Sequence, residues 1–227
     1  MQSKPFNSDG FLSLWPTQFM QRHLPNATLA NKALLTIILE QENSYNASSA
    51  QAQSSKSGDL TSDYLSQDFL AINNPVIGWL KECINKSIAD YLRHSGLKYN
   101  VDWGLQAWPN INRRGDYHNL HNHPHSYLSG TYYVAMPDQQ QIDKANRSDL
   151  NPGAISFYDP RGQANMLAIK DDAQVDAEYR VLPEAGMLLL WPSFLHHFVH
   201  PNASDEPRVS VSFNVVLKWR DDYVPAP

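Results

Sequence analysis

The feature that most constrains the fold is a change in sequence pattern after Tyr99. From there on, short alternating or apolar runs are separated by Gly, Pro, Asn and Asp, which is typical of strands joined by turns. The runs predict strands at 102–108, 117–123, 127–135, 153–158, 164–169, 177–182, 186–191, 195–200 and 207–218. About eight or nine short strands favour a barrel or a double-sheet sandwich. We therefore expect a mainly β fold.

Two helices are expected before the strand-rich region. At 26–42 the apolar residues recur at spacings of three and four, which is the period of a helix with one buried face. A second helix is predicted at 74–96, with Pro75 at its first position and a glycine at its end. The stretch 43–62 is rich in Ser, Ala, Gln and Asn and has little to bury, so we expect a loop there.

Composition bounds the class of protein. The 227 residues are enough for one large structural domain, in which we expect a helical extension at 1–100 to pack on a β-rich core at 101–227. The net charge of -5 comes without a basic run, which disfavours general nucleic-acid binding. The single cysteine, Cys83, excludes an internal disulfide and a zinc site built on several cysteines. Since we find no signal pattern and no membrane-spanning run, we expect a cytoplasmic protein without membrane contact.

Clustered histidines are the main functional signal. Of nine histidines, four lie in HNLHNHPH at 118–125 and three in HHFVH at 196–200. Because residues two apart on a strand share a face, His121 and His123 would project into the same space. A third imidazole from the distant cluster would complete a site for iron, zinc, copper or nickel with open positions, whereas an isolated pair would only be a solvated polar face. The spacing leaves three candidates for this imidazole, which are His196, His197 and His200.

The last predicted strand carries a candidate anion site. The segment PRVSVSFNVVLKW alternates, so its apolar residues share one face and its polar residues share the other. In an open sandwich the polar face would meet water. In a small barrel it would line a cavity, where the guanidinium of Arg208 and the hydroxyl of Ser210 could bind a carboxylate.

Four ordered segments resemble a known family. They are WPNINRRGDYHNLHNHPHSYLSGTYYV, FYDPR, GMLLLWPSFLHHFVHPN and EPRVSVSFN, all within about 103–217. Together they resemble the Fe(II)- and 2-oxoglutarate-dependent oxygenases, in particular a bacterial and phage branch of that superfamily. The resemblance implies a double-stranded β-helix, which is a jelly-roll barrel like that of the cupins, with flanking N-terminal α-helices.

The resemblance also implies residue roles. The residues that match the iron ligands, and so the catalytic centre, are His121, His123 and His197. Arg208 matches the residue that binds the distal carboxylate of 2-oxoglutarate, and Ser210 matches its helper hydroxyl. Further residues in the matching segments are candidates for secondary roles, and they are Asn110, Tyr132 and Arg161. Cosubstrate contacts are expected for Asn110 and Tyr132, although Tyr132 could equally be an aromatic core residue.

One position departs from the superfamily pattern. His123 stands where an aspartate is usual, so a neutral ligand replaces a carboxylate. Asp116 is an alternative second ligand, although the segment GDYH is more typical of a turn in which the aspartate binds its own backbone.

The implied activity is the oxidative decarboxylation of 2-oxoglutarate with O2, coupled to hydroxylation of an unknown substrate. One alternative is a three-histidine, cupin-type dioxygenase that does not use 2-oxoglutarate, and another is a non-catalytic barrel that binds a metal or small ligand. The loops at 43–62 and 137–153 could be lids, dimer contacts or inert insertions, and the flanking helices could pair in a homodimer.

Overall fold

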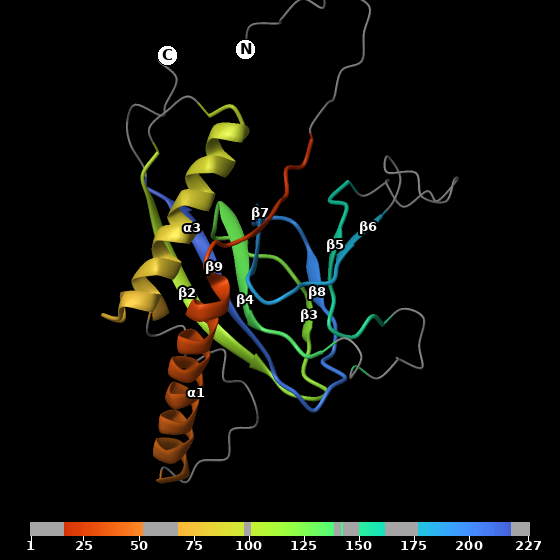
Figure 1. Cartoon of the computed structure of the whole chain (residues 1–227). Coiled ribbons are helices and arrows are strands. Elements are labelled where there is room, and N and C mark those ends of the chain that lie inside the picture. The colour runs from red at the N-terminus through yellow and green to blue at the C-terminus, as the bar shows by residue number, and fades with distance from the viewer. Residues whose placement is uncertain are drawn as a thin grey trace, which may run out of the picture.

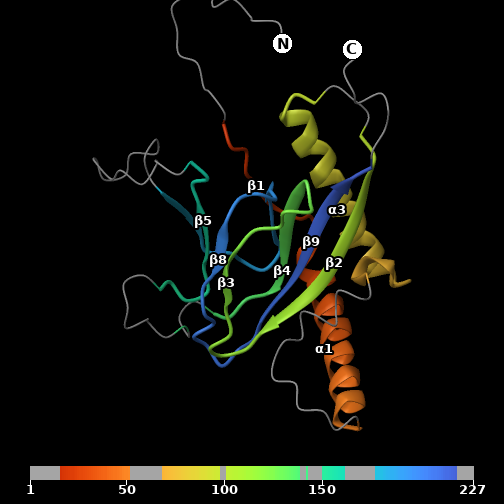
Figure 2. The same cartoon turned by 180° about the vertical axis from the view of Figure 1, so that it is seen from behind.

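The computed structural model describes residues 16–51, 68–97, 101–138, 142, 150–161 and 177–218. Within these ranges nine strands form two antiparallel sheets that face each other, and two long helices cover the outer side of the larger sheet (Figures 1 and 2). This arrangement confirms the expected double-sheet, mainly β architecture. No helix within the described ranges combines the length and apolarity needed to cross a membrane.

The two sheets differ in size and in strand order. The five-stranded sheet runs in the order β1 (Met20–His23), β7 (Met187–Pro192), β4 (Leu128–Ala135), β9 (Arg208–Leu217) and β2 (Trp103–Asn112). The four-stranded sheet runs in the order β3 (His118–His121), β8 (His197–Val199), β5 (Ile155–Tyr158) and β6 (Glu178–Val181). The helices are α1 (Ala27–Gln51), the short 3-10 helix η1 (Phe69–Ala71) and α3 (Pro75–His94).

Helix α3 begins and ends where the sequence indicates. The Asn74 side chain accepts a hydrogen bond from the backbone N–H of Val76 at 2.9 Å, and Pro75 fills the first helical position. After the helix Gly96 adopts a φ of 78°, which a residue with a side chain rarely adopts. The predicted helix is therefore confirmed.

Helix α1 is longer than predicted. It continues to Gln51, so our expectation of a loop is wrong for residues 43–51. The absence of apolar residues there argued against a buried face, but alanine and glutamine favour helix, and extending an existing helix costs little. The rest of the predicted loop, most of 137–153 and the predicted strand at 164–169 lie outside the described residues.

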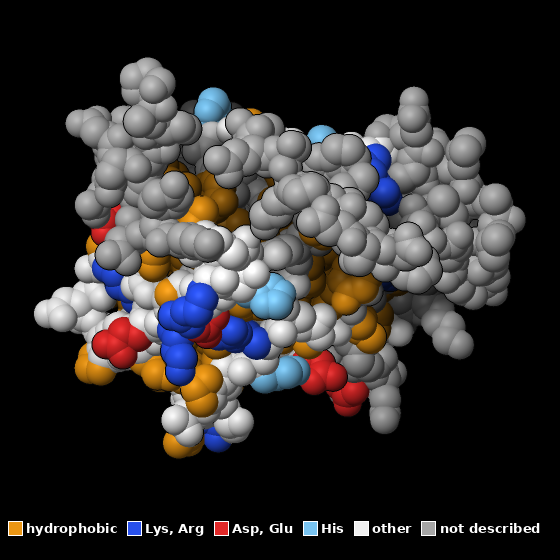
Figure 3. Space-filling model, turned by 90° about the horizontal axis from the view of Figure 1, so that it is seen from above, with side chains coloured by type: hydrophobic (Ala, Val, Ile, Leu, Met, Phe, Trp, Pro, Cys, Tyr) orange, Lys and Arg blue, Asp and Glu red, His pale blue; other side chains and the backbone are white. Residues whose placement is uncertain are grey.

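Strand β1 was not predicted, because distant contacts hold it. It pairs with β7 along its whole length. Arg22 of β1 binds Asp90 of α3 at 3.0 Å, and Arg93 binds the same carboxylate. These hydrogen bonds, that of Arg22 first, lower the pKa of Asp90 below its usual value. Figure 3 shows the molecule from above, and on the described part of this face basic, acidic and apolar side chains are mixed.

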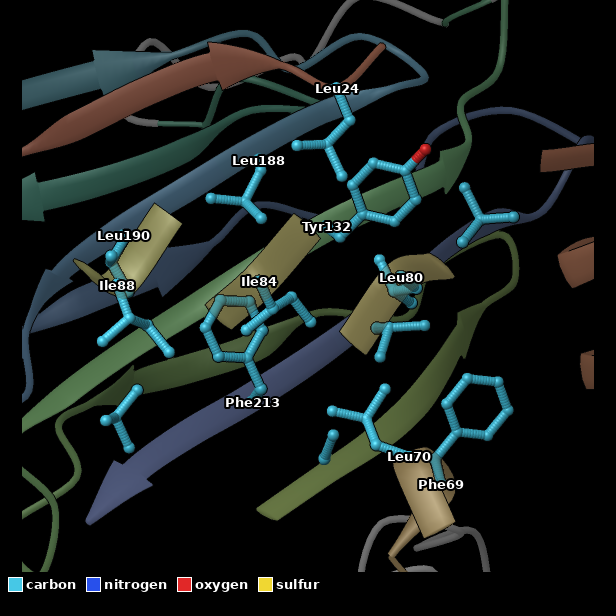
Figure 4. Close-up of a cluster of buried hydrophobic side chains, with 14 of the residues drawn as sticks. Leu24, Phe69, Leu70, Leu80, Ile84, Ile88, Tyr132, Leu188, Leu190 and Phe213 are labelled. Atoms are coloured by element: carbon cyan, nitrogen blue, oxygen red, sulfur yellow. The ribbon is translucent and has the colours of Figure 1, made fainter. Parts of the chain in front are cut away.

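The main core lies between the larger sheet and the helices. The apolar face of β9, including Val211 and Phe213, packs against Ile84 and Ile88 of α3 (Figure 4). The alternation in β9 therefore has the predicted consequence: its apolar residues form core, while Arg208 and Ser210 point between the two sheets and line a cavity.

Gly130 in β4 leaves room for the ring of Phe213, its direct cross-strand partner in β9. A methyl group at this position would clash with that ring and lie 2.7 Å from the carbonyl oxygen of Leu189. We expect Gly130→Ala to lower the free energy of unfolding by about 1 to 3 kcal/mol, since overpacking forces neighbours to move. The matched control is Gly78→Ala on the exposed side of α3, where no atom lies within 4 Å, and it should stabilise by about 0.5 to 1 kcal/mol. Urea unfolding of both variants measures the two effects, and equal effects would contradict this packing.

Candidate metal and anion site

Three histidines meet where β3 ends and β8 begins. His121 of β3 and His197 of β8 are direct cross-strand partners, and their ring centroids are 4.2 Å apart. His123 follows the end of β3, where its backbone N–H donates to the carbonyl of Ser193 at 2.9 Å. Its ring lies 5.1 Å from that of His121 and 5.3 Å from that of His197. The candidate ligand nitrogens of all three lie within 4.8 Å of one another.

Backbone carbonyls fix the tautomers of two of these histidines. Nδ1 of His121 lies 2.6 Å from the carbonyl oxygen of Asn119, and Nδ1 of His197 lies 3.1 Å from that of Leu195. Because a carbonyl only accepts, each Nδ1 carries the proton and donates it. Each Nε2 therefore keeps a lone pair for a metal ion, which is the arrangement typical of histidine ligands.

The surroundings keep His123 and His197 neutral. Burial, with a smaller contribution from His121, lowers the pKa of His197 to about 3 and that of His123 to about 4. The rings of Trp191 and Phe157 pack at 5.0 Å and 5.8 Å from that of His197. At neutral pH the imidazoles of His123 and His197 are therefore in their neutral form, in which one ring nitrogen keeps the lone pair that metal binding requires.

The other candidates for the metal site lie elsewhere. His196 is exposed, and the buried His200 is engaged with Ser156 and Asn151. Asp116 sits in a turn and accepts the backbone N–H of Arg113 at 2.8 Å, as its sequence pattern indicates. Among the described residues, His197 is thus the member of the second cluster that joins His121 and His123.

A cavity of about 50 Å³ adjoins the three histidines, which form part of its wall. Strands of the larger sheet supply most of its polar lining, including Asn110, Tyr133, Arg208, Ser210 and Ser212. Ser210 is the direct cross-strand partner of Asn110 on one side and of Tyr133 on the other. The side chains of Asn110, Ser210 and Tyr133 therefore form a row across the sheet. Arg208 precedes Ser210 by two residues and lies on the same face of β9.

Arg208 is the most unusual residue of the cavity wall. It is only 2% exposed, and its Nη1 donates to the backbone carbonyl of His200 at 3.2 Å, while Nη2 has no hydrogen-bond partner. Within the described ranges no carboxylate forms an ion pair with it. Burial lowers the pKa of Arg208, against the opposing influence of Tyr133 and Asp116, but a guanidinium stays charged in proteins. A buried cation without an ion-pair partner points to an anionic ligand.

Tyr132 faces the opposite side of the sheet. Its hydroxyl donates to Oδ1 of Asn31 in α1 at 2.5 Å, and its ring packs in the helix-side core with Leu80 (Figure 4). Of the two roles that the sequence left open for Tyr132, this position agrees with the core residue and contradicts the cosubstrate contact. Successive residues of a strand alternate in direction, so the neighbouring Tyr133 lines the cavity instead.

The remaining predicted residues and cavity residues fall into three groups. Asn110, a predicted site residue, donates from Nδ2 to Ser212 at 2.8 Å, and its buried Oδ1 has no partner. Arg161, a secondary candidate, is exposed and paired with Asp159, so it does not line the cavity. His118 and Trp191 line the cavity but were not predicted. The histidine cluster marked the former, whereas Trp191 could not be told from a core residue by sequence.

Comparisons with known proteins agree with this geometry. Residues 106–214 match the profile of a family described as "Putative 2OG-Fe(II) oxygenase". The structure is similar to a prolyl-4-hydroxylase of Pseudomonas putida, with a TM-score of 0.55 and 12% identity over 89% of both chains. A search of curated proteins found no significant match.

Two further solved structures are similar. One is a prolyl hydroxylase of Trichoplax adhaerens in complex with a hypoxia-inducible-factor peptide fragment, with a TM-score of 0.53 and 14% identity over 87% of this chain and 83% of that chain. The other is HygX from Streptomyces hygroscopicus with nickel and 2-oxoglutarate bound, with a TM-score of 0.52 and 13% identity over 88% of this chain and 82% of that chain.

The fold is therefore the double-stranded β-helix of these oxygenases. Together with this fold, the family match over residues 106–214 supports membership of the superfamily of Fe(II)- and 2-oxoglutarate-dependent oxygenases, whose members are oxidoreductases that use Fe(II), 2-oxoglutarate and O2.

Proposed function

We propose that the protein is a dioxygenase that couples decarboxylation of 2-oxoglutarate to hydroxylation of a substrate. His121, His123 and His197 would hold Fe(II), and Arg208 with Ser210 would bind the distal carboxylate of 2-oxoglutarate. The observation that carries the proposal is the buried Arg208, whose Nη2 has no partner in a cavity shared with the three clustered histidines.

The histidines suit a divalent metal of the first transition row. Two present Nε2 lone pairs fixed by backbone carbonyls, and the pKa of His123 and of His197 is low enough to keep the rings neutral. Three ligands from the protein leave further positions for a chelating cosubstrate and O2. A set of three neutral ligands also leaves more positive charge on the ion, which favours a dianionic chelator.

The opposite wall suits a dicarboxylate. The fork of Arg208 can pair with both oxygens of a carboxylate, and Ser210 adds a hydroxyl two residues away on the same face. Tyr133 lies across from Ser210, and burial raises the pKa of its hydroxyl against the opposing influence of Arg208, so the hydroxyl stays a hydrogen-bond donor. We assign Tyr133 the cosubstrate contact.

When bound, Fe(II) supplies the redox chemistry with O2, and the chain supplies binding and orientation. Phe157 and Trp191 keep water away from the side of His197 that faces the core. Arg208 and Ser210 fix the far end of the cosubstrate, so its 2-oxo acid end is directed toward the histidines. The primary substrate would approach from the exposed side of His121 and His123.

One observation favours a second candidate. His123 stands where the superfamily has a carboxylate ligand, and three-histidine sites occur in dioxygenases that bind their substrate without 2-oxoglutarate. In that case Arg208 would bind the carboxylate of the substrate itself. The two candidates differ in whether 2-oxoglutarate binds at all.

Equilibrium dialysis of labelled 2-oxoglutarate under anaerobic conditions separates the candidates. We expect one molecule of 2-oxoglutarate per chain in the presence of Fe(II) or Mn(II), and much weaker binding without metal. No metal-dependent binding would favour the three-histidine alternative. Dialysis of the metal alone is the control for an intact metal site.

Exchanging the two neighbouring tyrosines for phenylalanine tests the correction in β4. Tyr133→Phe should weaken 2-oxoglutarate binding by about 0.5 to 1.5 kcal/mol, since one hydrogen bond is lost. Tyr132→Phe should leave binding unchanged and lower the free energy of unfolding by about 1 kcal/mol, because Asn31 loses its donor. Calorimetric titration and urea unfolding measure these effects. Weaker 2-oxoglutarate binding in Tyr132→Phe, with unchanged binding in Tyr133→Phe, would assign the cosubstrate contact to Tyr132 instead.

Two expectations stay proposals. The helical extension at 1–100 and the core at 101–227 form one domain in our proposal, supported by the pairing of β1 with β7 and by the packing of α3 on the sheet. A cytoplasmic location rests on the sequence pattern alone.

A further inference from the structure

His200 is the histidine of the second cluster that the metal site does not use. It is 1% exposed, and its ring accepts a hydrogen bond at Nδ1 from the backbone N–H of Asn151 at 3.1 Å. Its Nε2 lies 2.7 Å from the hydroxyl of Ser156, which is fully buried. Because an amide N–H only donates, Nδ1 must be the acceptor, and Nε2 carries the proton that is donated to Ser156.

The hydrogen bonds continue from Ser156 to Glu178. Burial raises the pKa of Glu178, but hydrogen bonds from Ser156 and Arg180 outweigh this effect and lower the pKa below its usual value. Because the hydroxyl oxygen of Ser156 accepts from Nε2 of His200 and from Nε of Arg180 at 3.4 Å, its own proton points away from His200. In this arrangement His200 donates to Ser156 and cannot act as its base, so the pair is not a hydrolytic nucleophile. It is a fixed clamp on the ring of His200.

The backbone of His200 is also held on both sides. Its N–H donates to the carbonyl of Ala154 at 3.0 Å, and its carbonyl accepts Nη1 of Arg208 at 3.2 Å. Ring and backbone thus tie His200 to the segment 151–156, and the orientation of its carbonyl is fixed. Among the described residues, the carbonyl of His200 is the acceptor with which the buried guanidinium of Arg208 forms a hydrogen bond.

We propose that His200, clamped by Ser156 and Asn151, is a positioning residue that orients Arg208 for recognition of a dicarboxylate. The His200 carbonyl accepts a hydrogen bond from Nη1 of Arg208, and this leaves Nη2 for the distal carboxylate of the cosubstrate. His200 does not line the cavity, so it acts only through Arg208. The inference rests on the proposed function and deepens it, because it assigns the selection of 2-oxo diacids over 2-oxo monoacids to this clamp.

The test compares two probes that differ only at the far end. 2-Oxoglutarate and 2-oxobutyrate share the 2-oxo acid group that chelates metal, but 2-oxobutyrate has no distal carboxylate. Their dissociation constants are measured anaerobically with Mn(II) for the wild type and for Ser156→Ala, which removes the partner of Nε2. His200→Phe removes both ring hydrogen bonds, and His200→Gln can restore the one to Ser156. The exposed His196→Phe is the matched control.

We expect Ser156→Ala and His200→Phe to lower the selectivity for 2-oxoglutarate over 2-oxobutyrate by about 10-fold to 100-fold, because a small displacement of a positioned group has effects of this size. Mn(II) binding and the affinity for 2-oxobutyrate should stay unchanged, and His200→Gln should recover part of the selectivity. In an Arg208→Ala background, Ser156→Ala should have no further effect on 2-oxoglutarate binding.

Different failures identify different errors. If the wild type is selective and the variants keep that selectivity, even with a lower melting temperature, His200 is only a structural residue and the inference is overturned. Equal losses for the two probes would overturn it in the same way. If the wild type does not prefer 2-oxoglutarate over 2-oxobutyrate, the proposed function fails, and the inference fails with it.

Discussion

Arg208→Ala should weaken 2-oxoglutarate binding by about 2 to 5 kcal/mol, which is about 30-fold to 5,000-fold in the dissociation constant. The effect is large because the guanidinium is buried and has no other anionic partner within the described part of the chain. Iron binding should be retained, since the three histidines lie on other strands or beyond their ends. Anaerobic calorimetric titration with Mn(II)-loaded protein measures both affinities.

Two variants sharpen this experiment. Arg208→Lys keeps a charge but loses the fork, so it should bind with intermediate affinity. Arg161→Ala is the matched control, because Arg161 is exposed and pairs with Asp159 away from the cavity. A loss of iron affinity with unchanged 2-oxoglutarate affinity in Arg208→Ala would show that the anchoring role is wrong.

The second large effect is expected at His197. His197→Ala removes one of three ligands and should weaken Fe(II) binding by more than about 100-fold, because even outer-shell changes at metal sites cost 10-fold to 100-fold. The same change at the exposed His196 should leave metal affinity unchanged. His200→Ala should keep most of the metal affinity, since its ring is engaged with Ser156 and Asn151.

Metal affinity is measured by anaerobic competition with a chromogenic chelator, and the melting temperature of each metal-free variant shows whether it is folded. His197→Gln is a less disruptive second variant, because it fills more of the buried space. Equal losses of affinity at His196, His197 and His200 would contradict the assignment of His197 as the distal ligand.

Local patterns in the sequence predicted the parts of the site that lie on regular strands. In β9 the alternation places Arg208 and Ser210 on one face, and that face lines the cavity. The argument for His121 and His123 was less accurate. The sequence suggested one strand through both, but β3 ends at His121, and His123 is held by the carbonyl of Ser193. The two histidines meet for a reason that only the tertiary structure provides.

Other features depend on contacts that a sequence does not display. Tyr132 and Tyr133 are adjacent and chemically identical, so only the pairing of β4 with β9 decides which one faces the cavity. Strand β1 depends on β7 and on the ion pair of Arg22 with Asp90. The place of Trp191 in the cavity wall depends on its contact with His197, because the turn between β7 and β8 brings the two rings together.

The most direct test of the central claim is anaerobic titration of the protein with Fe(II) and then with 2-oxoglutarate, followed by visible absorption spectroscopy. We expect a weak charge-transfer band from 2-oxoglutarate chelated to iron, and its loss in Arg208→Ala at the same cosubstrate concentration. Fe(II) binding without such a band in the wild type would contradict 2-oxoglutarate dependence and favour the three-histidine alternative.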